Sequence, residues 1–144
     1  MPSFSPFSLV PPDDPVLRTV ARAVFEWEIP ALGDPKFLYW LGKFLKQSGG
    51  IAIAAPQLGD SRAYFLWDDG LVINPRITFR GGMTEERTET CLSFPGREAL
   101  VERPIEIAVE YTDENRALRS RHLHYHRARV FLHEYDHLIG KCIV

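Results

Sequence analysis

The sequence is poor in cysteine, and its acidic and basic residues nearly balance. Two cysteines, Cys91 and Cys142, occur in 144 residues, which excludes a disulfide framework and fits a reducing compartment. The formal net charge of -2 offers no electrostatic basis for binding nucleic acid or a membrane surface. No apolar run approaches the ~18 residues that a membrane-spanning helix needs, and the N-terminus lacks the pattern of a signal peptide. We therefore expect a cytoplasmic protein without nucleic-acid or membrane partners.

The composition fits one folded domain. Hydrophobic residues make up 45% of the chain and charged residues 25%, which is enough apolar content for one core. We expect residues 1–144 to form a single domain. Residues 1–15 are rich in proline, so they are expected to be extended. A short helix is expected to start at Asp14-Pro15 and to cover Val16, Leu17, Val20 and Val24.

Helices are expected near both ends of the chain. Asp34 is a favoured N-cap, Pro35 suits the first helical position, and apolar residues then recur at helical spacing until Gly49. A second helix is expected from about residue 126 to residue 138. Short strands are expected at 63–67, 71–73 (ended by Asn74-Pro75), 76–80, 105–111 and 117–124. This order predicts an α+β fold, with mainly antiparallel sheets packed around the central C-terminal helix and one long N-terminal helix.

A metal-binding pattern, H-E-x-x-H, is formed by His133, Glu134 and His137. Positions i and i+4 share one face of a helix, so the two imidazoles can bind one metal ion, with the carboxylate as general base. A catalytic metal usually has three protein ligands, and no acidic residue follows Asp136. Cys91 is the strongest candidate for the third ligand, because a thiolate binds zinc and ferrous iron well.

At this point the chain resembles the peptide deformylases, whose signatures are G-φ-G-φ-A-A-x-Q, E-G-C-φ-S and Q-H-E-x-D-H, where φ is apolar. The corresponding stretches occur in the same order here: Gly50-Ile51-Ala52-Ile53-Ala54-Ala55-Pro56-Gln57, Glu89-Thr90-Cys91-Leu92-Ser93 and Leu132-His133-Glu134-Tyr135-Asp136-His137. The resemblance covers nearly the whole chain and is to a divergent member with a short C-terminus.

The resemblance implies hydrolysis of the N-formyl group from the formyl-methionine of nascent peptides, with release of formate. Cys91, His133 and His137 resemble the ligands of one divalent ion, Fe(II) in cells, with Zn(II), Ni(II) or Co(II) as substitutes. The partner is then an extended formylated peptide that pairs with backbone near the first two signatures. A transient ribosome contact is a further expectation, and the sequence carries no signal for an oligomeric state.

Three residues resemble the family's catalytic groups. Glu134 resembles the acid and base that moves a proton from water to the leaving amine. Gln57 and the backbone N–H of Leu92 resemble the donors that hold the formyl oxygen as it becomes an oxyanion. The residues expected to bind substrate are Gly50, Ile51, Ala52, Arg87, Thr90, His126, Arg129 and Val130.

Several positions depart from the family pattern. Ala52 and Thr90 replace glycines where the substrate backbone approaches, and Leu132 replaces a glutamine. His126 and Arg129 share a helix face with His133, where the family has an apolar methionine pocket.

Two explanations for these polar residues stay open. Either the face is solvent-exposed and the arginines, Arg87 included, extend outward, or the pocket prefers a polar or carboxylate side chain.

Other residues allow further hypotheses. Asp136 points away from the metal-binding face and is expected to pair with an arginine such as Arg103. His122, His124 and His126 alternate as on one strand face, but no carboxylate or cysteine is near them in sequence, so a second metal site is not expected. The alternative functions are a deformylase-like hydrolase of another N-acylated molecule and a non-catalytic peptide- or ribosome-binding homologue.

Overall fold

The computed structural model describes residues 6–144, so the first five residues of the predicted proline-rich lead-in lie outside the described residues. The elements, with η for a 3-10 helix, are η1 (Pro15–Arg18), η2 (Glu26–Glu28), α1 (Ile29–Leu32), α2 (Pro35–Gln47), β1 (Ile53–Ala54), η3 (Ala55–Leu58), β2 (Tyr64–Trp67), β3 (Gly70–Arg80), β4 (Thr84–Thr90), β5 (Glu98–Pro104), β6 (Glu106–Thr112), β7 (Leu118–His124) and α3 (Tyr125–Leu138). Among these described helices, none is long and apolar enough to cross a membrane.

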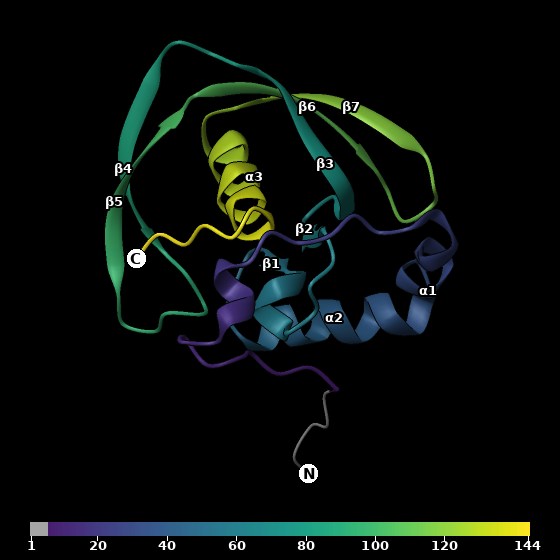
Figure 1. Cartoon of the computed structure of the whole chain (residues 1–144). Helices are drawn as coiled ribbons and strands as arrows, with labels where there is room; N and C mark the ends of the chain where they lie inside the picture. Colours follow the sequence, from purple (N-terminus) through teal and green to yellow (C-terminus); the bar gives the residue numbers. More distant parts are fainter. Residues whose placement is uncertain (1–5) are drawn as a thin grey trace.

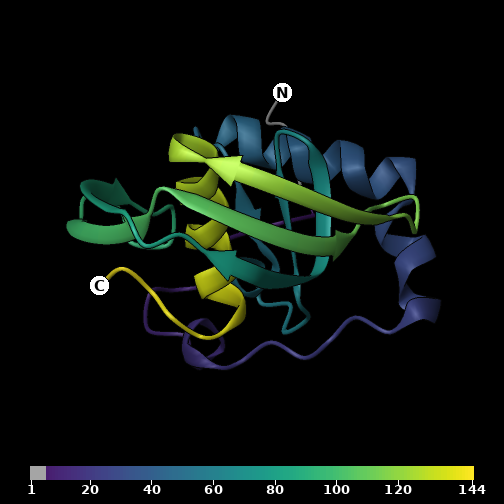
Figure 2. The ribbon, with the colours of Figure 1, turned by 90° about the horizontal axis from the view of Figure 1, so that it is seen from above.

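The strands form two antiparallel sheets. One has five strands in the order β1-β2-β3-β6-β7, and the other is the β4-β5 pair. Figure 1 shows α3 in yellow between the β4-β5 ribbon and the larger sheet, and Figure 2 shows β6 and β7 extending across it. The predicted α+β class with antiparallel sheets is confirmed.

The apolar face of α3 is held by aromatic rings of the larger sheet. The ring of Phe131 lies 5.1 Å from that of Phe65, 5.5 Å from that of Trp67 and 6.1 Å from that of Tyr111, measured between centroids. Phe131 is fully buried, and its edge-to-face contacts with Phe65 and Trp67 fix the orientation of its ring. This packing sets the rotation of the helix, so the face with His133 turns toward the β4-β5 ribbon.

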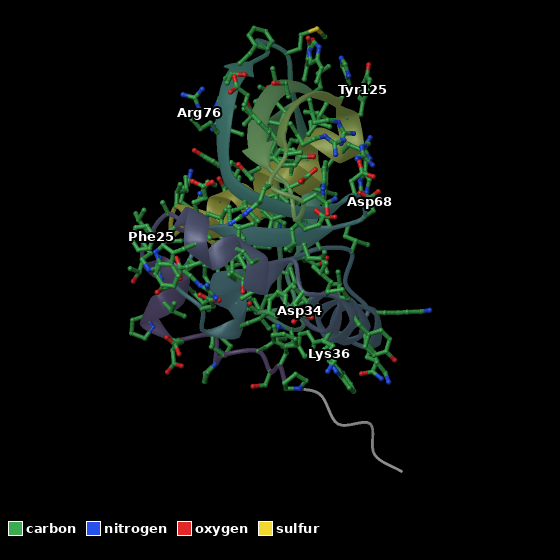
Figure 3. The ribbon with its side chains drawn as sticks, turned by 90° about the vertical axis from the view of Figure 1, so that its right-hand side faces the viewer. Phe25, Asp34, Lys36, Asp68, Arg76 and Tyr125 are labelled. Carbon is green, nitrogen blue, oxygen red and sulfur yellow. The ribbon has the colours of Figure 1, made fainter. Side chains whose placement is uncertain are left out.

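The helix α2 covers the other end of the sheet. The Asp34 side chain accepts a hydrogen bond of 2.8 Å from the backbone N–H of Lys36, as an N-cap residue does, and Figure 3 labels both residues. Leu41 and Leu45 face inward and pack with Ile53 of β1 in one apolar cluster. This packing supports β1, which leads directly into η3, where the candidate catalytic residue Gln57 lies.

The structure corrects two predicted boundaries. Asn74-Pro75 does not end a strand, because β3 continues to Arg80 through a register shift relative to β6. Asn74 adopts a left-handed φ of 53°, and its side chain exchanges two hydrogen bonds with the backbone of Val24, which satisfies the irregular turn. The early helix ends at Arg18.

The C-terminal segment after α3 packs against η1. Gly140 has a φ of 78°, and a Cβ there would lie 2.9 Å from the backbone of Arg18, so a larger residue would not fit without movement. Cys142 is a free thiol whose Sγ donates to the carbonyl of Leu17. Leu17 and Cys142 pack in one apolar cluster with Cys91, so both ends of the described chain support the loop after β4.

Candidate active site

The three expected metal ligands meet although 46 positions separate Cys91 from His137. Cys91 follows β4 directly, and its Sγ lies 3.3 Å from Nε2 of His137. The rings of His133 and His137 on α3 have centroids 5.3 Å apart. One potential ligand atom from each of the three residues lies within 4.8 Å of the other two.

These residues fit a divalent transition metal ion. One thiolate and two imidazoles suit iron or zinc and leave a fourth position for water. His133 Nδ1 lies 2.8 Å from Oε1 of Glu89, which leaves Nε2 for a metal, and such a carboxylate partner is typical of metal-binding histidines. Burial lowers the pKa of His137 to about 3, so its imidazole is neutral as a metal ligand must be.

Glu134 lies beside these ligands in the interior. It is buried, its Oε2 is 4.0 Å from Nε2 of His133, and its Oε1 has no hydrogen-bond partner among residues 6–144. Burial raises the pKa of Glu134 to about 7. A carboxylate with this pKa can both accept and return a proton near neutrality.

Glu89 organises the charges behind the ligands. Arg103 donates to it through Nε at 2.6 Å and Nη2 at 2.8 Å, and Arg129 donates through Nη1 at 2.6 Å. Burial alone would raise the pKa of Glu89, but hydrogen bonds from Arg103 and His133 lower it to about 2. Glu89 is therefore ionised and holds the ring of His133 in one orientation.

The expected pairing of Asp136 is confirmed. Its Oδ2 accepts a hydrogen bond of 2.9 Å from Nη1 of Arg103, so one guanidinium links Asp136 on α3 to Glu89 on β4. Arg103 is 5% exposed, and a buried guanidinium needs such compensation.

Gln57 is fixed beside the ligands by both ends of its amide. Its Oε1 accepts a hydrogen bond from the backbone of Ala54 at 2.8 Å. Its Nε2 lies 3.0 Å from Oγ of Ser93 and 3.5 Å from Sγ of Cys91. The amide N–H₂ group therefore points toward the ligands, as a preorganised donor would.

All eight residues that were expected to bind substrate line one cleft of about 570 Å³. Gln57, Leu92, Cys91, His133 and Glu134 line the same cleft, and His137 lies buried behind it. A Cβ on Gly50 would lie 2.5 Å from Cδ1 of Leu92, so a larger residue in the segment before β1 would require the Leu92 side chain to move.

The polar residues of the cleft follow neither expected explanation completely. Arg129 does not extend outward: its side chain is 11% exposed, and besides Glu89 it donates to the carbonyls of Val101 and Glu85. Arg87 is 64% exposed and pairs with the carboxylate of Glu85. The positive charges of Arg129 and Arg87 are thus compensated by carboxylates of the protein itself. His126, the third polar residue, is exposed.

The departures from the family signatures have different surroundings. Leu132 is 1% exposed and packs in the main core, where an apolar residue is well suited. Ala52 is also buried, whereas Thr90 is exposed on β4. Both residues line the cleft.

Sequence reasoning missed the hydrogen bonds that Glu89 makes with two arginines and one histidine. Its position two residues before Cys91 was the only sequence signal for it, since Arg103, Arg129 and His133 lie 14, 40 and 44 positions away. Ser93, which contacts Gln57, was likewise not singled out.

A largely buried Cys-His-His set, with a carboxylate of raised pKa at the end of a cleft, defines the class of metal-dependent hydrolases. Comparison with known proteins identifies the family. The family described as polypeptide deformylase matches residues 6–144, and the chain belongs to this family of enzymes that remove the N-formyl group from nascent peptides.

Relatives and solved structures agree with this assignment. Peptide deformylase from Thermotoga maritima is 36% identical over 135 residues, covering 91% of this chain and 80% of the relative. The crystal structure of that organism's peptide deformylase has a TM-score of 0.87 at 34% identity, covering 95% of this chain and 94% of the other. A Plasmodium falciparum peptide deformylase in complex with an inhibitor has a TM-score of 0.86 at 31% identity, with 94% and 86% covered.

Proposed function

We propose that this chain removes the formyl group from the N-terminal formyl-methionine of nascent peptides and releases formate. The observation that supports it most directly is the meeting of Cys91, His133 and His137 within 4.8 Å beside the buried carboxylate of Glu134. We further infer that the ion is Fe(II) in cells and that Zn(II), Ni(II) or Co(II) can replace it, since a thiolate and two imidazoles suit all four.

The reaction adds water to the formyl carbon and breaks the bond between that carbon and the amide nitrogen. A divalent ion held by Cys91, His133 and His137 supplies Lewis acidity to the formyl group and to the water. Glu134 accepts the proton of the attacking water and returns it to the leaving amine, which its pKa of about 7 favours. The products are formate and a free N-terminal amine.

Two donors are proposed to stabilise the oxyanion. Gln57 Nε2 points toward the ligands, and the backbone N–H of Leu92 belongs to the same cleft wall. Glu89 holds His133 in orientation from behind. Preorganised donors of this kind are worth about 2.7–4 kcal/mol each in the transition state.

An extended peptide is proposed to add to the sheet edge next to the cleft. β1 is an edge strand of the five-stranded sheet, and Gly50, Ile51 and Ala52 just before it line the cleft. Thr90 at the end of β4 lines the opposite side. An exposed edge offers unpaired backbone groups to such a peptide.

The first side chain of the substrate is proposed to lie against His126, Arg129 and Val130. Because Glu89 and Glu85 already compensate the charges of Arg129 and Arg87, neither arginine offers an unpaired cation to a substrate carboxylate. We therefore expect formyl-methionine to remain the preferred substrate. Steady-state rates on matched formyl-Met and formyl-Glu peptides test this, and faster hydrolysis of formyl-Glu would contradict it.

The activity itself is tested by formate release. The protein is purified without oxygen, its metal is measured, and formyl-peptides are supplied to the wild type and to Glu134→Ala. The wild type should release formate, whereas Glu134→Ala should keep its metal and lose activity. Metal-loaded wild type that hydrolyses no formyl-peptide would leave another N-acylated substrate or a binding role as the function.

The domain organisation, the location of the protein and its contact with the ribosome are predictions that accompany this function. We infer that residues 1–144 form one deformylase-like domain whose sheets pack around α3, with α2 as the long N-terminal helix. A nascent-peptide substrate favours a cytoplasmic location and a transient ribosome contact.

A further inference from the structure

A second group of metal-type ligands lies on the outer face of the five-stranded sheet. Glu106 on β6 pairs directly with His124 on β7, and His122 lies two residues earlier on the same face. Oε1 of Glu106 is 2.7 Å from Nε2 of His122, and the rings of His122 and His124 have centroids 4.7 Å apart. One potential ligand atom from each residue lies within 4.8 Å of the other two.

The strand pairing holds these side chains together. Ile107 and Leu123 pair on the opposite face and are 0% and 2% exposed, so the core anchors the backbone between the ligands. Ala108 pairs with His122, and its small side chain leaves room for the imidazole to lean toward Glu106. A carboxylate and two imidazoles are thus brought together on two adjacent, well-anchored strands.

We propose that Glu106, His122 and His124 bind a second divalent transition metal ion, with Zn(II) as the best fit. Two imidazoles and one carboxylate are a common zinc ligand set that leaves further positions for water. Calcium and magnesium are disfavoured, because they prefer oxygen ligands alone. The three residues are partly exposed or exposed, so an ion in solution can reach them without opening the fold.

The second site is separate from the first in place and in chemistry. None of its three residues is among those that line the active-site cleft, and its donors are nitrogen and oxygen without a thiolate. The inference therefore does not depend on the proposed activity, and metal binding tests it without any substrate.

The site adjoins the start of α3. His124 is followed directly by Tyr125, the first residue of α3, which has a left-handed φ of 52°. Figure 3 shows Tyr125 at the outer surface, toward the opposite end of the molecule from Asp34, the N-cap of α2, and Lys36 within that helix. An ion held here would join β6 to the last residue of β7, and zinc should raise the melting temperature.

Metal stoichiometry tests the site in the full chain. Protein with its first site loaded is dialysed against Zn(II) and analysed for bound metal. The wild type should bind two ions, whereas Glu106→Gln and His124→Ala should each bind one. Glu110→Gln is the matched control, because Glu110 lies on the same face of β6 but pairs with Arg76, and it should still bind two.

Cobalt gives an independent readout that also locates each ion. The first Co(II) ion should produce the thiolate charge-transfer absorption of Cys91, and the second should add bands without increasing it. His122→Ala should lose only the second step. One bound ion in the wild type, a second ion that persists in both Glu106→Gln and His124→Ala, or a second step with further thiolate absorption would overturn the proposal.

Discussion

Two regions of this molecule bring together three metal-type ligands at similar spacing, but they differ in what surrounds them. Cys91, His133 and His137 come from a loop and a helix and lie in the interior. Glu106, His122 and His124 come from two adjacent strands and face solvent. Ligand spacing alone therefore does not separate a catalytic metal centre from a surface site.

The difference lies in the supporting contacts. Behind the buried ligands, Glu89 binds His133 and accepts hydrogen bonds from two arginines, so the orientation of the imidazole is fixed. At the surface, the Glu106–His122 contact belongs to the ligands themselves, and no further carboxylate among residues 6–144 orients either imidazole. We expect the buried site to hold its ion more tightly and to supply the chemistry.

The largest effect is expected from removing a buried ligand. Cys91→Ala should lose the metal of the first site and reduce formate release to the background rate, because two histidines alone do not retain a catalytic ion. Metal analysis and a formate assay measure both effects, with Cys142→Ala as the cysteine control. Full activity and full metal content in Cys91→Ala would remove the proposed distinction between the regions.

Removing the proton carrier should have the next largest effect. Glu134→Gln keeps the size of the side chain but cannot accept a proton, so kcat should fall by about 10²–10⁴-fold. The bound metal should be unchanged by atomic absorption. Glu106→Gln makes the same chemical change at the surface site and should leave kcat unaltered; an equal fall in both variants would contradict the assignment of catalysis to the buried region.

Weakening the support of a ligand should have a smaller effect than removing the ligand. Glu89→Gln removes the charge that orients His133, and the metal affinity of the first site should fall by about 10–100-fold. Competition with a chelator measures that affinity. Glu85→Gln is the control on the same strand, because its carboxylate binds the exposed Arg87, and it should leave the affinity unchanged.

The arginine behind the cleft should matter for stability. Arg129→Met removes the hydrogen bonds to the carbonyls of Val101 and Glu85 and the cation beside Glu89, so we expect a loss of about 1–3 kcal/mol in the free energy of unfolding. Arg87→Met removes an exposed arginine and should leave the free energy of unfolding nearly unchanged. Urea unfolding of both metal-loaded variants compares them, and equal losses would contradict the role given to Arg129.

The smallest effect is expected at the surface site without added zinc. His122→Ala should change the unfolding free energy of protein with only its first site loaded by less than about 0.5 kcal/mol and leave formate release unchanged, because the side chain is exposed. A large loss of activity in this variant would show that the surface region supports catalysis.

Sequence reasoning succeeded where the signal was local. The H-E-x-x-H spacing predicted that His133 and His137 share one helix face, as they do on α3, and the three ordered signatures indicated the family that the comparisons establish. The pairing of Asp136 with Arg103 was also anticipated, because a helix position opposite the ligands needs a compensating partner.

It failed where strand pairing decides the neighbours. β4 was not recognised because all but one of its side chains are at least partly exposed, so no alternation of apolar and polar residues marks it. Glu106 and His122 are 16 positions apart and meet only through the register of β6 with β7, so the histidines were judged to lack a carboxylate nearby.

The exposed histidines of β7 also bear on purification. Two adjacent surface imidazoles with a carboxylate should bind immobilised nickel, so the untagged chain should be retained on such a resin and eluted by imidazole. A polyhistidine tag would obscure this behaviour and add its own ions to any metal count. The stoichiometry of this protein is therefore best measured on chain that carries no tag.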